Sequence, residues 1–144
     1  SKAGAESKRK RDSIEAFRKA VEYMDGNPDP LRNYREKITL LEKAFKLGDP
    51  QMKANAKERI HELNKNALAA LAMRKKQMLD SYFDETKAKA YAFLKKKEFE
   101  KAAELWNSLK SVPQCSESRE MRAKIDREIE YARSLKEKNA EGLE

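Results

Sequence analysis

The stretch KKKEFEKAAELWNSLKSVP, Lys95 to Pro113, decides between two interpretations of the fold. Its three consecutive lysines suggest a basic binding patch, whereas Phe99, Ala102 and Trp106 have the spacing of one buried helix face. Three consecutive residues cover about 200° of a helix surface, so the lysines cannot form one flat basic face. Glu98 beside them further dilutes their charge. The stretch therefore predicts a turn with solvated lysines that leads into a packed helix.

The composition of the whole chain predicts an all-α protein. Of its 144 residues, 40% are charged and 39% are hydrophobic, and only four are glycines and four are prolines. No segment shows the apolar alternation and the Val, Ile and Thr enrichment of strands. A chain of this length fits one domain. We expect a flexible basic leader over residues 1–11, a single helical domain over 12–138 and a frayed tail over 139–144.

Helix boundaries follow from capping residues, glycines and prolines. Asp12 predicts the start of the first helix as its N-cap, and Gly26 predicts a left-handed cap at its end. Asp29-Pro30 and Asp49-Pro50 each have the pattern of an N-cap followed by a first helical residue. Between these two signals we expect a helix over residues 30–47.

The segment after Pro50 is predicted as one long helix that ends near Leu79. The apolar spacing passes through Asn64–Asn66 without a change of phase, although a break there, giving two antiparallel helices, is the alternative. A bend is expected over residues 80–84. The last helix, over about 117–138, has one apolar and one charged face and is expected to cap a stack of helices.

The helix in the opening stretch resembles the second helix of a tetratricopeptide repeat. Phe99, Ala102, Trp106 and Pro113 follow that family's order of an aromatic residue, an alanine, a large residue and a closing proline. In that family the alanine permits two antiparallel helices to approach closely, and the aromatic residues fill the space between neighbouring repeats. Ala90 would be the small residue that the preceding helix contributes.

The resemblance covers residues 84–113, with departures. Thr86, Lys89 and Lys97 stand where the family has Trp, Leu and Gly. A second, weaker match covers residues 14–48, where Lys37 occupies the position of the close-contact alanine.

The resemblance implies a stack of five to seven antiparallel helices that ends in an amphipathic capping helix. It also implies a non-enzymatic role in protein–protein interaction or assembly scaffolding, because stacked helix pairs form concave surfaces that hold peptides or partner helices. Basic residues that line such a groove would select an acidic segment or a C-terminal carboxylate. The candidates for this role are Arg74, Lys87 and Lys89, although each of them can equally be a solubilising surface charge.

Nucleic-acid binding is the alternative function. The net charge of +8 is spread thinly along the chain, with a modest maximum of +4 over residues 51–83, seven basic minus three acidic. A dedicated DNA-binding domain concentrates its basic residues on one face. If the chain binds RNA or DNA, the expected contacts are Lys8, Arg9, Lys10, Arg11, Arg74, Lys75 and Lys76.

Catalytic and metal-binding patterns are sparse, so we expect no enzyme and no cofactor. Glu58 and His61 have the Glu-x-x-His spacing of di-iron helical proteins, but those sites need two such pairs and His61 is the sole histidine. The four glycines are isolated and form no phosphate-binding loop. Cys115, the one cysteine, is expected to be an incidental surface residue.

Localisation stays open between the cytoplasm and an exported or periplasmic compartment. No apolar run approaches the ~20 residues that span a bilayer. The chain starts with Ser1 rather than Met, so a leader or anchor can precede it. A third interpretation is therefore a structural segment of a larger membrane-anchored or exported protein, with its basic N-terminus near anionic headgroups.

Overall fold

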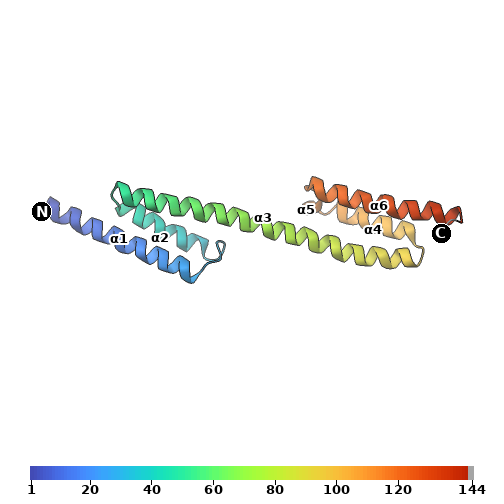
Figure 1. The fold of residues 1–144 in the computed structure, drawn as a ribbon, viewed down its shortest axis with the longest axis horizontal. Coiled ribbons are helices and arrows are strands. Elements are labelled where there is room, and N and C mark those ends of the chain that lie inside the picture. Colours follow the sequence, from blue (N-terminus) through green and yellow to red (C-terminus); the bar gives the residue numbers. More distant parts are fainter. Residues whose placement is uncertain (143–144) are drawn as a thin grey trace. The chain divides into compact units, whose positions relative to one another are not determined.

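The computed structural model describes residues 1–142, and within them the chain forms six helices and no strand, which confirms the all-α prediction. The helices are α1 (Lys2–Gly26), α2 (Tyr34–Leu47), α3 (Pro50–Lys95), α4 (Phe99–Lys110), α5 (Pro113–Ser116) and α6 (Arg119–Ala140) (Figure 1). The chain divides into two compact units, one of Ser1–Met73 and one from Arg74 onward, and the division falls within α3. The single domain expected over 12–138 thus contains parts of two units, each with its own hydrophobic core.

Helix α1 begins and ends differently from the expectation. Its N-cap is Ser1, whose Oγ accepts a hydrogen bond from the Gly4 N–H at 3.1 Å, so Asp12 is not a cap and residues 2–11 are helical. Asn27 closes the helix: its N–H bonds to the Met24 carbonyl, and its Nδ2 donates to the Tyr23 carbonyl at 3.0 Å. Gly26 is the last residue of the helix and does not adopt the left-handed conformation that we expected.

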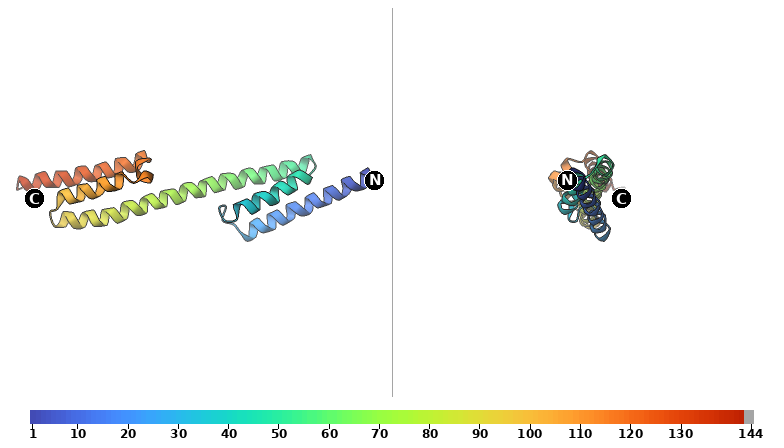
Figure 2. Two further views of the ribbon diagram at one scale, coloured as in Figure 1. Left: turned by 180° about the vertical axis from the view of Figure 1, so that it is seen from behind. Right: turned by 90° about the vertical axis from the view of Figure 1, so that its left-hand side faces the viewer.

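The first unit is built from α1, α2 and the N-terminal part of α3, with successive helices antiparallel (Figures 1 and 2). Its core begins with one small residue from each helix, Ala16, Ala44 and Ala56, which permits the three backbones to approach closely. A second cluster continues this core toward the loop between α1 and α2. Its buried residues are Ala20, Leu41 and Leu63, with Phe17, Met24, Tyr34, Ile38, Leu40 and Ile60 packed around them.

The two prolines that were expected to open helices have different outcomes. At Asp49-Pro50 the prediction is confirmed, because Asp49 Oδ1 accepts from the Met52 N–H at 2.9 Å and α3 begins at Pro50. At Asp29 the carboxylate instead accepts from the Leu31 N–H at 3.0 Å and forms a local turn. Helix α2 then begins only at Tyr34, after Asn33 with φ of 55°. The expected start at Pro30 is therefore wrong.

Helix α3 continues from Pro50 to Lys95 without a break. The preference for a single helix through residues 64–66 is confirmed, whereas the expected end at Leu79 and the bend over 80–84 are wrong. Leu79, Phe83 and Ala90 are all buried against the helices that follow. A continuous helix keeps these three side chains on one face, so tertiary packing favours its extension.

The second unit combines the C-terminal part of α3 with α4, the short α5 and α6, and its successive long helices are antiparallel (Figure 2). Trp106 lies at the centre with 1% exposure, which confirms the prediction that it is a core residue. Helix α6 begins after Ser118, whose Oγ accepts from the Met121 N–H at 3.1 Å. Its apolar face is buried as predicted, through Met121, Ile125, Ile129 and Ala132.

The expected frayed tail over 139–144 is helical at its start, because α6 extends to Ala140. Residues 143–144 of that tail lie outside the part of the chain that the structure describes.

Lys97 forms the turn between α3 and α4 in the left-handed conformation, with φ of 60°. Its N–H bonds to the Leu94 carbonyl at 3.0 Å, and the Glu98 N–H bonds to the Phe93 carbonyl at 2.9 Å. This pair of bonds is a Schellman motif, and Lys97 occupies its left-handed position. The family that the sequence resembles usually has a glycine at this turn. The turn therefore keeps the glycine conformation although a lysine occupies it.

Candidate protein-interaction surface

Two cavities lie along α2 and α3 in the first unit, and one of them, of about 470 Å³, is at the end where α2 begins. At this end the Tyr34 hydroxyl is hydrogen-bonded to Asn64 Oδ1, which fixes the start of α2 on α3. The lining is almost wholly apolar. It consists of Leu31 and Tyr34 on one side and of Asn64, Ala67, Leu68 and Leu71 on the other.

A second cavity of about 540 Å³ lies further along the same two helices. It is lined by Glu42, Phe45, Lys46, Lys57 and Ile60. At about 100° per residue, the α3 residues Lys57, Asn64, Leu68 and Leu71 fall within an arc of roughly 60°. Both cavities therefore open on the same side of the helix pair, and we name them together the α2–α3 groove.

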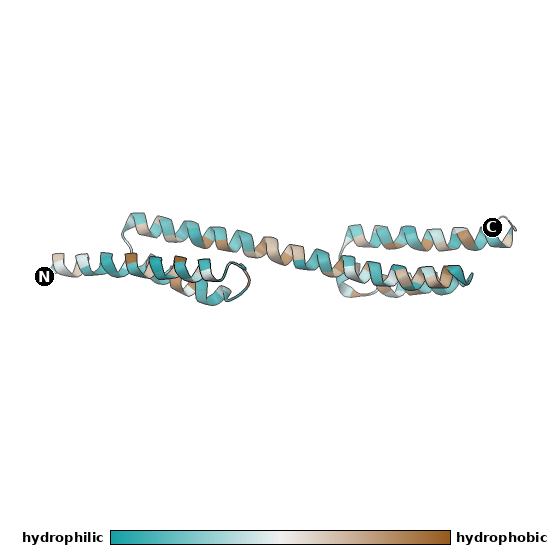
Figure 3. Cartoon of the chain, turned by 60° about the horizontal axis from the view of Figure 1, so that its bottom comes forward, coloured by the Kyte–Doolittle hydropathy of each residue, from teal (hydrophilic) through white to brown (hydrophobic). Residues whose placement is uncertain are grey.

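Large apolar side chains of the groove are open to solvent. Leu68 is 68% exposed and Leu71 is 52% exposed, in a part of α3 with marked apolar character (Figure 3). Met73 is 57% exposed, but it lies about 200° around the helix from Leu71 and so outside the groove. Exposed apolar residues that line a concave surface are typical of interaction sites, whereas single ones are common on any protein.

Positive charge gathers at the second cavity. Lys46 and Lys57 line it, and Lys53 extends over the Phe45 ring with its Nζ 4.5 Å from the ring centroid. The same Nζ donates to the Phe45 carbonyl at 2.8 Å, at the end of α2 where carbonyl groups carry partial negative charge. Glu42 is the one acidic residue that lines this cavity. The groove is thus apolar at one end and basic at the other.

The three lysine and arginine residues predicted to bind a partner do not form one site. All lie on α3 in the second unit, but Lys87 and Lys89 are two residues apart and therefore point about 200° away from each other. Lys87 is half-buried, with its Nζ 5.4 Å from the centroid of the Tyr91 ring, and Lys89 is exposed. Arg74 is exposed too. Their binding role stays a prediction.

The predicted nucleic-acid contacts are divided between the two units. Lys8, Arg9, Lys10 and Arg11 are exposed on α1 in the first unit, while Arg74, Lys75 and Lys76 are exposed on α3 in the second. Arg9 is turned back onto its own unit, since its Nη2 donates to the Lys46 carbonyl at 3.0 Å. Four consecutive residues also spread over about 300° of α1, so each cluster offers only part of its charge to one ligand. Nucleic-acid binding stays a prediction.

A cavity of about 270 Å³ at the opposite end of α2 from Phe45 contains the buried Lys37. Its Nζ donates to the Asp29 carbonyl at 2.6 Å, and that carbonyl also accepts from the Arg32 N–H. Asp25 and Glu62 line the same cavity together with Arg59, so both signs of charge are present. Through this bond the Lys37 side chain contacts the loop between α1 and α2.

Cys115 is buried, contrary to the expected surface position. It belongs to α5, where packing against α4 and α6 covers it, and this burial raises the pKa of its thiol. No group of three or more His, Cys, Asp or Glu side chains within residues 1–142 is placed to hold a metal ion. His61 is exposed on α3.

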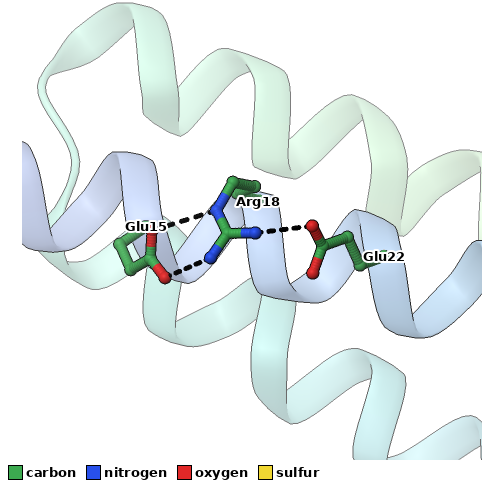
Figure 4. Close-up of polar contacts among 3 residues, drawn as sticks. All are labelled: Glu15, Arg18 and Glu22. Carbon is green, nitrogen blue, oxygen red and sulfur yellow. Dashed lines mark hydrogen bonds and ion pairs between the residues drawn. The ribbon is translucent and has the colours of Figure 1, made fainter.

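Three charged side chains on α1 form ion pairs with one another. Arg18 donates to Glu15 through Nε at 3.0 Å and also pairs with Glu22 one turn later (Figure 4). The hydrogen bond from Arg18 lowers the pKa of Glu15, and the same bond raises the pKa of Arg18. All three side chains are exposed, so the cluster stabilises α1 only weakly and leaves little charge for a ligand.

The sequence patterns considered above did not point to the groove residues, although a signal for them exists. The run ALAALAM over residues 67–73 is too apolar for a helix with one buried face, which leaves some of its side chains without cover. What the pattern could not reveal is that Leu31, which precedes α2, lines a cavity together with Leu68 and Leu71 and leaves both of them exposed.

The comparisons with known proteins add no relative. The sequence matches no protein-family model, and searches of curated proteins and of solved structures found no significant match. Among the described residues, no helix combines the length and apolar character that crossing a bilayer requires.

Proposed function

We propose that this chain is a non-enzymatic protein-interaction module, related in design to tetratricopeptide repeats, that holds a partner in the α2–α3 groove. The observation that carries the proposal is the exposure of Leu68 and Leu71 along a concave surface. Exposed apolar residues of this size in a concave site are stabilised when a partner covers them, because burial removes apolar area from water at about 25 cal/mol per Å².

The repeat relationship is supported by the helix pair over residues 84–113. Ala90 on α3 and Ala102 on α4 are both fully buried in one core, as the close approach of two repeat helices requires. Trp106 fills the space beside them, and Lys97 holds the conformation of the family's turn glycine. In the weaker match the buried Lys37 replaces the alanine and bonds to the Asp29 carbonyl.

A capture experiment with groove variants tests the proposal. Full-length chain is immobilised, and the proteins it retains from native lysate, treated with nuclease, are compared between the wild type and the double variant Leu68→Glu/Leu71→Glu. We expect the variant to lose retained proteins, since two carboxylates in the groove would oppose the burial of an apolar partner.

The matched control is Met73→Glu, which changes an equally exposed apolar residue on the same helix but outside the groove. This variant should retain the same proteins as the wild type. Unchanged retention by the double variant, with its helical content intact by circular dichroism, would refute the proposed role of the groove.

A further inference from the structure

The two ends of the groove differ in charge, and this difference determines which kind of partner fits it. The end lined by Leu31, Leu68 and Leu71 has no charged lining residue among those that the structure describes. The other end carries Lys46, Lys53 and Lys57 around the exposed Phe45 ring, with Glu42 as its one acidic neighbour.

We propose that the occupant of the α2–α3 groove is a partner helix that is apolar in one half of its length and acidic in the other half. The acidic half lies beside Lys46, Lys53 and Lys57. This inference rests on the proposed function and specifies its partner class. The groove extends along α3 from Lys57 to Leu71, which corresponds to about 21 Å or four helical turns. A partner helix of about 14 residues spans this length.

Charge complementarity favours this occupant over a second copy of the chain. The chain carries a net charge of +8, so two copies repel each other and would bring basic residues to a basic cavity. Its own helices α4 and α6 also keep their apolar faces buried in the second core. An acidic helix, by contrast, gains both apolar burial at Leu68 and Leu71 and favourable charge contacts at the lysines.

Synthetic peptides of defined pattern test the inference on the full chain. One labelled 14-residue helical peptide has leucines on one face of one half and glutamates in the other half, and it is made in both sequence orders. A matched peptide has lysines in place of the glutamates. Fluorescence anisotropy is measured at about 50 mM and about 300 mM NaCl, where screening separates charge from apolar contributions.

We expect the glutamate peptide to bind saturably in one of its two orders and the lysine peptide to bind at least about tenfold more weakly at low salt. The double variant Lys46→Glu/Lys57→Glu should reverse this preference, and Leu71→Glu should abolish binding of both. The control Met73→Glu should bind as the wild type does.

Three results would overturn the inference. Equal affinity for the glutamate and lysine peptides would show that charge does not select the partner. Absence of binding, together with concentration-dependent dimerisation that Leu71→Glu abolishes in light scattering, would assign the groove to a second copy. If neither peptide binds while Leu68→Glu/Leu71→Glu still loses retained proteins from lysate, the partner class is wrong and the proposed function stands.

Discussion

The ring of Phe83 on α3 lies against the ring of Trp106 on α4, with centroids 4.9 Å apart and planes inclined by 42°. Lys124 of α6 also lies over the Phe83 ring, with its Nζ 4.2 Å from the ring centroid. Three helices thus meet at one aromatic pair, which makes Trp106 the most sensitive position of the second core.

Trp106→Ala should destabilise the chain by roughly 3–5 kcal/mol, because it removes a fully buried indole and leaves a cavity between α3, α4 and α6. The measurement is urea denaturation followed by circular dichroism. Tyr131→Ala is the control, since that ring is 47% exposed on α6 and its loss should cost under about 1 kcal/mol. Similar effects of the two substitutions would contradict the placement of Trp106 in the core.

Lys97→Gly should stabilise the chain by about 0.5–1 kcal/mol, since a lysine at φ of 60° carries strain that glycine avoids. Lys96→Gly is the matched control in the same turn, because Lys96 does not have a positive φ and glycine there only adds freedom to the unfolded chain. The measurement is the midpoint of urea unfolding of each of the two variants. A loss of stability in Lys97→Gly would argue against the left-handed turn.

Gly48→Ala should destabilise the first unit by about 1–3 kcal/mol. A Cβ at this position would lie 2.7 Å from Met52 Cβ and 2.9 Å from the Ala44 carbonyl oxygen, and neither atom can swing away freely. Gly26→Ala meets no atom within 4 Å, so we expect it to be neutral or to stabilise by up to about 1 kcal/mol. Thermal unfolding of the two variants measures the difference, and equal midpoints would rule out the tight packing at Gly48.

Lys37→Ala should cost roughly 2–4 kcal/mol, because it leaves the space of a long buried side chain empty. Lys37→Met fills that space without a charge, and the Asp29 carbonyl still accepts from the Arg32 N–H. Replacement of a buried charge by an apolar side chain of similar volume is often neutral, so we expect a change under about 1.5 kcal/mol. If Lys37→Met is as unstable as Lys37→Ala, the bond from Nζ to Asp29 is what holds the loop.

Cys115 should resist alkylation in the native chain. Its sulfur is buried, and burial also raises the pKa of its thiol, which lowers the fraction of reactive thiolate at a given pH. The rate of modification by iodoacetamide at about pH 8–9 should be many times lower than in urea-denatured chain. Native rates close to the denatured ones would show that α5 does not cover the thiol.

Local signals in the sequence determined most of the secondary structure. The Asp49-Pro50 cap, the apolar face of α6 and the burial of Trp106 all follow from patterns within one or two helical turns. Such patterns depend on hydrogen bonds and side-chain spacing between residues that are close in the chain, so they can be interpreted without knowledge of distant elements.

Tertiary structure decided what those local patterns leave open. The extension of α3 through residues 80–84 depends on the burial of Leu79 and Phe83 by α4 and α6, which lie later in the chain. The burial of Cys115 also depends on neighbouring helices, as does the exposure of Leu68 and Leu71 beside α2. A residue's own sequence neighbourhood sets the direction of its side chain, but only the packing of other elements decides whether that side chain is covered.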